Sequence, residues 1–336
     1  MRASAPRPGE RAPADSEPDG EPEIEVPPRP RGKVLALVGP TASGKTAMAL
    51  EIAPELGAEI VSCDSMLVYR GMDIGTAKPT AEERARVRHH LVDIVEPARD
   101  FTVQQFQTVA RAAIDEISSR GKRPLLVGGS GLYFRAVVDA LEFPGTDPKL
   151  RERLEKEASE ADPREFHARL AERDPEAAAR ISPANVRRVV RALEVWEVTG
   201  RPFSSFRKAW DARESVYPLK VCGLSVPPED LSRRIEDRVR RMLEAGLVEE
   251  TRALAARPMS RTARQALGYK EILDHLAGHC TLEEAVALTV RRTRAFARRQ
   301  LSWFRADPRV CWLPASEGAT GVLEFFRGPV VEGGMQ

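Results

Sequence analysis

The sequence predicts an α/β protein in which helices flank a parallel sheet and an all-helical insertion interrupts the strand pattern. Short apolar runs alternate with helical patterns over residues 32–146, and the first run leads directly into the glycine-containing segment "GPTASGKT". Residues 147–218 are instead helical and charged, without strand signals. Strands that alternate with helices indicate βαβ units and therefore a parallel sheet.

The strands of this sheet are expected at short apolar runs bounded by turn residues or helices. Pro54 lies late in the first helical pattern and is expected to kink or end that helix, because proline has no N–H to donate. The expected strands are residues 34–38 ("VLALV"), 58–63 ("AEIVSC"), 91–95 ("LVDIV"), 123–129 ("RPLLVGG") and 220–226 ("KVCGLSV").

Asp-Pro pairs mark the expected helix starts of the insertion. Asp147, Asp162 and Asp174 are each followed by Pro, so the Asp is expected to cap a helix whose first turn holds the Pro. After the return to the sheet, further helices are predicted, including one over 281–306.

These patterns divide the chain into four parts. Residues 1–31 are rich in Pro and charge and have too little apolar surface to order themselves, so a disordered tail is expected. Residues 32–146 and 219–315 are expected to form the core, 147–218 the insertion, and 316–336 a C-terminal tail.

The composition sets limits on partners and location. The net charge of +2 gives no global field, so nucleic-acid contacts would need local basic clusters. No stretch approaches the roughly 20 apolar residues of a membrane span, and no apolar signal-peptide core is evident. The cysteines form no CxxC pair, so neither a zinc site nor a disulfide framework is predicted. We therefore expect a cytoplasmic protein without membrane contact. A monomer is also expected, although the composition does not determine the oligomeric state.

The segment "GPTASGKT" fits the spacing G-x-x-x-x-G-K-[ST] of a phosphate-binding loop, so the predicted core is P-loop NTPase-like. Its glycines allow a tight turn whose N–H groups converge on anionic oxygens at a helix N-terminus. Lys45 adds a positive charge, and Thr46 offers a hydroxyl to Mg²⁺. The residues expected to hold phosphate are Gly39, Pro40, Thr41, Ala42, Ser43, Gly44, Lys45 and Thr46.

An acidic residue at the end of a second strand usually holds Mg²⁺ in proteins that transfer phosphate from ATP. The run "PLLVGGSGLY" has no such acid, whereas "AEIVSCD" places Asp64 at its strand end. Ser65, Met66 and Leu67 follow Asp64, beside the expected loop, where open α/β sheets bind ligands. These residues predict a ligand crevice but leave open whose phosphate the loop holds.

A longer series of motifs resembles the tRNA dimethylallyltransferases, enzymes that transfer an isopentenyl group to an adenosine beside the anticodon. The resemblance covers about residues 33 to 315. In chain order the motifs are "GPTASGKT", "SCDSMLVYRGMDIGTAKP", "HHLVDI", "LLVGGSGLYFRA", "NVRRVVRALEVWEVTGRP", "QALGYKE" and "TRAFARRQLSWFR".

This resemblance implies a reaction and its substrates. The loop would hold the diphosphate of dimethylallyl diphosphate, and Mg²⁺ would need only that diphosphate and Thr46. The dimethylallyl group would pass to N6 of adenosine 37 in the anticodon stem-loop of tRNA, with release of diphosphate. N6 is a poor nucleophile, so a carboxylate must accept its proton.

The resemblance also assigns roles to single residues. Asp64 would be the base, with an N-cap or Mg²⁺-contacting role as the plainer alternative. Ser130 and Arg151 would lie near the reacting groups, although they also fit a turn residue and an exposed helix residue. Arg238 would add charge for the diphosphate, or would lie on a solvated helix face.

RNA contacts are expected where basic or family-like segments gather. Asp64, Ser65, Met66 and Leu67 would meet an adenine taken out of its stack. The aromatic residues Trp196, Phe296, Trp303 and Phe304 are expected in the core. The other expected tRNA contacts are Arg187, Arg188 and Arg191, then Gln265, Gly268, Tyr269 and Lys270, and on the late helix Arg291, Arg294, Arg298 and Arg305.

Other functions remain open on the residues alone. A kinase acting on a small molecule or nucleoside would share the loop and the sheet, and would be distinguished by binding ATP. A tRNA-binding protein without catalysis would not need the intact loop and Asp64. An isopentenyltransferase acting on free adenine nucleotides would not need the arginines of the insertion.

Overall fold

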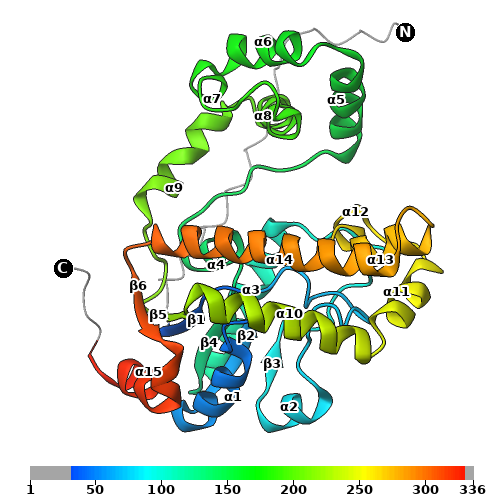
Figure 1. Cartoon of the computed structure of the whole chain (residues 1–336). Helices are drawn as coiled ribbons and strands as arrows, with labels where there is room; N and C mark the ends of the chain where they lie inside the picture. Colours follow the sequence, from blue (N-terminus) through cyan, green and yellow to red (C-terminus); the bar gives the residue numbers. More distant parts are fainter. Residues whose placement is uncertain (1–31, 330–336) are drawn as a thin grey trace, which may run out of the picture. The chain divides into compact units, whose positions relative to one another are not determined.

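The computed structural model describes residues 32–329 (Figure 1), so the expected tail over 1–31 lies outside the described residues. Six strands of the described chain form one sheet in the order β3-β2-β4-β1-β5-β6, and every neighbouring pair is parallel. The predicted α/β fold is confirmed. The strands are β1 (Val34–Val38), β2 (Ala58–Ser62), β3 (His89–His90), β4 (Arg123–Gly128), β5 (Leu219–Ser225) and β6 (Val310–Pro314).

Strand β1 shows why the strand runs are apolar throughout. Side chains alternate along a strand, so Leu35 and Leu37 enter one apolar core while Val34, Ala36 and Val38 enter another on the opposite face. All five are almost fully buried. Full burial of one such side chain contributes about 1.5–3 kcal/mol, so a sheet covered on both faces favours apolar residues at every position.

Helices cover both faces of the sheet (Figure 1). Helix α1 runs from Lys45 to Leu56 with Pro54 in its last turn, and it ends at Gly57 in the left-handed conformation (φ 60°). The expectation for Pro54 is therefore confirmed. The other core helices before the insertion are α2 (Ala81–Arg86), α3 (Val103–Ser119) and α4 (Gly131–Val138).

Helix α14 (Leu282–Arg305) confirms the long helix expected over 281–306 and lies beside α10 in Figure 1. Ala297 of α14 and Ile235 of α10 belong to one buried cluster. Within residues 32–329, no helix combines the length and the apolar character needed to cross a membrane. The other helices after the insertion are α10 (Pro228–Glu244), α11 (Leu247–Ala255), α12 (Arg261–Arg264), α13 (Tyr269–Leu276) and α15 (Gly318–Arg327).

The segment between the core strands is helical, as predicted. Asp147, Asp162 and Asp174 each accept backbone N–H groups at a helix start, with Pro in the first turn. Side chains from these helices form a buried cluster of their own, which includes Phe166 and Leu193. The helices are α5 (Pro148–Glu160), α6 (Pro163–Arg173), α7 (Pro175–Ala178), α8 (Val186–Thr199) and α9 (Arg207–Ala212), with a 3₁₀ turn over Phe203–Phe206.

The strand predicted over 91–95 is wrong. The sheet contains only His89–His90 of this region, because Leu91 and Asp93 have positive φ angles of 63° and 58°, which no strand accommodates. The Asp93 carboxylate binds Lys78 at 2.6 Å and Arg84 at 2.7 Å. Lys78 and Arg84 lie outside the apolar run 91–95, so their ion pairs with Asp93 stabilise a turn that the run itself does not predict.

The end of the described chain is also more ordered than expected. Strand β6 was not predicted, and α15 occupies part of the segment 316–336 that was expected to be a tail. Val322 and Phe326 of α15 are buried in the same core as Leu35 and Leu37 of β1. The helix therefore covers a face of the sheet that would otherwise expose apolar side chains.

Candidate active site

The carboxyl ends of the parallel strands bring the predicted site residues to one edge of the sheet. Strand β1 ends at Val38 and leads into the phosphate-binding loop, and β2 ends at Ser62, two residues before Asp64. Strand β4 ends at Gly128, two residues before Ser130. Parallel strands place these ends side by side, where open α/β sheets bind their ligands.

The loop has the backbone conformation that its glycines permit. Gly39 and Gly44 have φ angles of 147° and 94°, which residues with side chains rarely adopt. Gly44 is the N-cap residue of α1, so Lys45 and Thr46 start the helix and the N–H groups of its first turn face the loop. Lys45 Nζ donates to the Pro40 carbonyl at 2.5 Å. The loop is thus an anion site at a helix N-terminus.

Burial changes the charge state of Lys45. Loss of solvent and, to a smaller extent, the nearby Arg238 guanidinium lower its pKa to about 7, although the Asp64 carboxylate acts in the opposite direction. At neutral pH the ammonium is therefore only partly formed. A bound anion would favour the protonated form, since an opposite charge raises the pKa of a lysine.

Two cavities meet at this edge of the sheet. The cavity that we call the loop cavity has a volume of about 600 Å³ and is lined by Lys45, Thr46 and other loop residues. The one that we call the helix cavity has a volume of about 350 Å³ and is lined by residues of α10, α14 and the segment 265–268. Both are lined by the same six residues, which form what we call the junction: Thr41, Asp64, Thr76, Arg238, Phe296 and Gln300.

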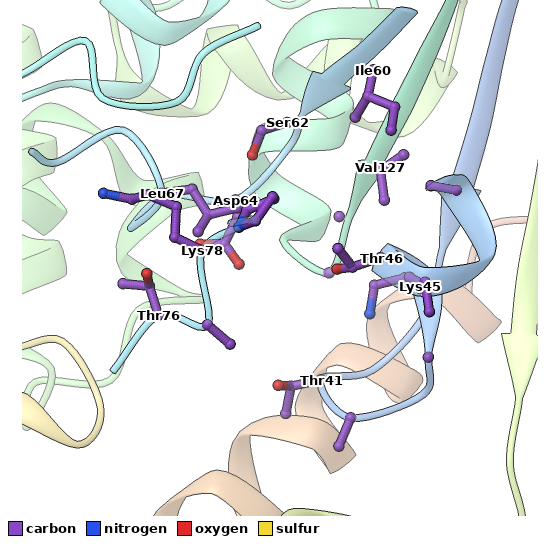
Figure 2. Close-up of a pocket in the computed structure, with 18 of the residues that line it drawn as sticks. Thr41, Lys45, Thr46, Ile60, Ser62, Asp64, Leu67, Thr76, Lys78 and Val127 are labelled. Atoms are coloured by element: carbon purple, nitrogen blue, oxygen red, sulfur yellow. The ribbon is translucent and has the colours of Figure 1, made fainter. Parts of the chain in front are cut away.

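Asp64 is oriented within the junction by its own backbone. Its Oδ1 atom accepts the N–H of Met66 at 2.8 Å. Figure 2 shows Asp64 across the loop cavity from Lys45 and Thr46. Leu67 lines the loop cavity, while Ser65 and Met66 line the helix cavity. Asp64 can therefore face ligands in both cavities at once.

Helix α10 supplies positive charge to the loop cavity. Arg234, Arg238 and Arg241 all line it, because positions spaced by four and three residues share one helix face. Arg238 donates to the Thr76 carbonyl at 3.1 Å, and none of the three forms an ion pair with a carboxylate of residues 32–329. Their spacing would have predicted Arg234 and Arg241 along with Arg238.

Two predicted site residues bind a buried carboxylate instead of lining either cavity. Arg151 and Arg191 bind Glu194, which is fully buried, at 2.6 Å and 2.8 Å. Arg191 also donates to the carbonyls of Pro144 and Gly145. A buried carboxylate needs such partners, since breaking a pair of this kind typically costs about 3–5 kcal/mol. Arg151 and Arg191 therefore help to hold the insertion together, and their predicted roles at the substrates stay predictions.

The segment "QALGYK" is divided between the site and its support. Gln265 and Gly268 line the helix cavity, whereas Tyr269 is fully buried. The Tyr269 hydroxyl donates to Glu250 at 2.6 Å and accepts the N–H of Gly75 at 3.1 Å. Tyr269 therefore supports the loop that carries Thr76, and Lys270 lines neither cavity.

The remaining predicted residues are distributed as follows. Ser130 lines the helix cavity, and Arg187 and Arg188 are exposed at the start of α8. Phe296 lines both cavities, and Trp303 is 42% exposed, so the expectation that both lie in the core is wrong.

Sequence reasoning missed Lys78 and Gln300. Lys78 lines the loop cavity, but its charge is balanced by Asp73 at 2.5 Å and Asp93 at 2.6 Å. Gln300 is buried at the junction. A glutamine within an arginine-rich helical run gives no local sign of burial, so only the fold identifies it.

The comparisons with known proteins agree with this geometry. A family model described as IPP transferase matches residues 67–307. A tRNA dimethylallyltransferase of Streptomyces coelicolor is 55% identical over 86% of this chain and 91% of its own length. Another tRNA dimethylallyltransferase, from Kineococcus radiotolerans, is 52% identical over 87% of this chain and 93% of its own length.

Solved structures extend the similarity to the fold. The crystal structure of a tRNA isopentenylpyrophosphate transferase from Bacillus halodurans is 42% identical, with a TM-score of 0.65 over 88% of this chain and 95% of that one. A eukaryotic dimethylallyltransferase acting on tRNA is 26% identical, with a TM-score of 0.77 over 90% of this chain and 81% of that one. The chain therefore belongs to the IPP transferase family, the tRNA dimethylallyltransferases.

Proposed function

We propose that this protein transfers the dimethylallyl group of dimethylallyl diphosphate to N6 of adenosine 37 in tRNA and releases diphosphate. The observation that carries the proposal is the place of Asp64, at the junction between a cavity built for anions and a second cavity. A donor held by the loop and an adenine in the helix cavity would meet beside one carboxylate. A kinase would instead need a site for the γ-phosphate and its acceptor at the loop itself.

The loop cavity is proposed to hold the diphosphate. The N–H groups at the start of α1 and the Lys45 ammonium would bind its oxygens on one side, and Arg234, Arg238 and Arg241 would bind them on the other. These donors are in place before the reaction, so they stabilise the charge that develops on the leaving diphosphate without reorganisation.

Mg²⁺ is proposed to bind together with the diphosphate. In phosphate sites this ion is usually held by one or two protein oxygens plus the substrate phosphates. The Thr46 hydroxyl provides such an oxygen at the loop cavity, so the residues present fit the ion. When bound, Mg²⁺ would neutralise part of the negative charge of the diphosphate.

The helix cavity is proposed to receive the adenine. An adenine must leave its stack to enter such a pocket, and loop nucleotides do so at the lowest cost. N6 would attack the allylic carbon that carries the diphosphate, the carbon–oxygen bond would break, and its electron pair would leave with the diphosphate. Asp64, whose Oδ1 is held by the Met66 N–H, would accept the N6 proton.

The exposed arginines at the start of α8 are proposed to contact tRNA phosphates. Replacing Arg187 and Arg188 with Ala is expected to weaken tRNA binding and to reduce the slope of log K against log salt by up to about 2, about 1 per lost contact. Binding isotherms over a salt series measure this slope. Arg153→Ala is the control, because this arginine is already paired with Glu197. An unchanged slope in the double variant would remove α8 from the RNA interface.

The low pKa of Lys45 predicts a pH-dependent affinity for dimethylallyl diphosphate. The free group has a pKa of about 7, and bound diphosphate would raise that pKa. Above pH 7 binding must therefore take up a proton, so the affinity should fall by up to about tenfold per pH unit between pH 7 and 9. Below pH 7 this group is already protonated and contributes no slope. Calorimetry in buffers of different ionisation enthalpy would measure the uptake, and absence of proton uptake at pH 8 would contradict the assignment.

A single chain supplies the loop, the carboxylate and both cavities, which supports a monomer as the working form. We propose the cytoplasm as its location because tRNA is the proposed substrate.

The test of function is incubation with labelled dimethylallyl diphosphate and unmodified tRNA, followed by nucleoside analysis. Label in N6-dimethylallyladenosine at position 37 supports the proposal. Label transferred only to free adenine nucleotides, or stabilisation by ATP but not by dimethylallyl diphosphate, would support the alternatives.

A further inference from the structure

Gln300 of α14 occupies an unusual position among the residues of the site. It belongs to the junction, and only 7% of its surface is exposed. It lies so close to Gly129 that a Cβ atom there would be 2.3 Å from Gln300 Nε2. The glycine thus makes room for the amide, which is held between the end of β4 and the phosphate-binding loop.

The orientation of the amide follows from its partner in the loop. The Thr41 N–H donates to Gln300 Oε1 at 2.8 Å, and only the oxygen of an amide can accept this bond. The Nε2 group, which carries two N–H donors, must therefore face away from Thr41. No acceptor within residues 32–329 takes a hydrogen bond from it, so these donors are available to a ligand at the junction.

This arrangement changes the expected set of phosphate contacts. The Thr41 N–H was expected to bind phosphate, but it is already occupied by Gln300. Gln300 Nε2 instead offers N–H donors beside Thr41, at the junction that Asp64 also lines. These donors therefore lie between the proposed diphosphate site in the loop cavity and the place where Asp64 would meet the adenine.

We propose that Gln300 is a catalytic residue whose Nε2 donates a hydrogen bond to the oxygen that leaves the allylic carbon. This inference rests on the proposed function. As N6 bonds to the carbon, the carbon–oxygen bond breaks and its electron pair moves to that oxygen, while the N6 proton goes to Asp64. Gln300 gives up no proton. It stabilises the charge that appears on the oxygen, and being neutral it binds the charged product less tightly than a cation would.

Two substitutions separate this role from simple support of the loop. Gln300→Glu keeps an oxygen for the Thr41 N–H but removes the donors, whereas Gln300→Met removes both functions and keeps the length of the side chain. Gln104→Met is the matched control, because Gln104 is exposed on α3. Single-turnover rates are measured with both substrates saturating, together with the Kd of each substrate and the melting temperature.

We expect both Gln300 variants to lose about 10²–10³-fold in the single-turnover rate, as is typical for removal of one preorganised donor. In the Met variant both Kd values should stay within a few-fold of wild type. Near-normal turnover in the Glu variant would overturn the proposal, because support of Thr41 would then suffice. A normal rate with weakened tRNA binding would overturn it in favour of a contact with the base. If wild type itself failed to modify tRNA, the proposed function would fail, independently of Gln300.

Discussion

Replacing Asp64 with Asn is expected to lower the single-turnover rate of transfer about 10²–10⁴-fold, the usual effect of removing a general base. Asn keeps the size of the side chain and can still accept the N–H of Met66, as Asp64 Oδ1 does at 2.8 Å. It cannot take up the N6 proton at neutral pH. Both substrates should remain bound within a few-fold of wild type, so the loss should appear in the chemical step.

The measurement is single-turnover transfer to an anticodon stem-loop, made beside direct binding of each substrate. Asp115→Asn is the control, since Asp115 is exposed on α3. Near-normal turnover in Asp64→Asn would mean that the base lies elsewhere. Loss of diphosphate binding with intact tRNA binding would instead indicate that Asp64 acts through Mg²⁺.

Replacing Lys45 with Ala is expected to give the second large loss, of about 10²–10³-fold in turnover, because it removes a positive donor aimed at the leaving diphosphate. Affinity for dimethylallyl diphosphate should fall, while tRNA affinity changes little, since Lys45 lines only the loop cavity. The proton uptake at pH 8 should disappear in the same variant. Lys122→Ala, at an exposed turn before β4, is the control. Equal losses of affinity for both substrates would contradict a role confined to the diphosphate.

The sequence predicted the strands and helix starts that depend only on neighbouring residues. Buried strands covered on both faces are apolar throughout, so β1, β2, β4 and β5 could be read from the sequence within one residue at each end. The caps at Asp147, Asp162 and Asp174 depend only on neighbouring N–H groups. The strand prediction for residues 91–95 failed because the conformation there depends on ion pairs of Asp93 with residues nine and fifteen positions away.

The candidate site divides in the same way. The loop and Asp64 follow directly from strand ends, but the charged residues depend on partners that no local pattern reveals. Arg151 and Arg191 look like any exposed arginines, and only the fold shows that Glu194 is buried between them. The sequence does not show that Gln300 faces the junction, because this depends on how α14 packs against the phosphate-binding loop. The family resemblance suggested the chemical role of each residue. The structure shows which N–H groups are already bound within the protein and which remain available to a ligand.

The contact between Gly75 and Tyr269 has an evolutionary consequence. A Cβ atom at position 75 would lie 2.4 Å from the Tyr269 ring, so a larger residue there requires a smaller one at position 269. A smaller residue at 269 would remove the hydroxyl that binds Glu250. The three positions are therefore mutationally coupled across nearly two hundred positions of sequence. Among descendants of this chain, substitutions at Gly75, Glu250 and Tyr269 should appear together, and any one of them alone should be rare.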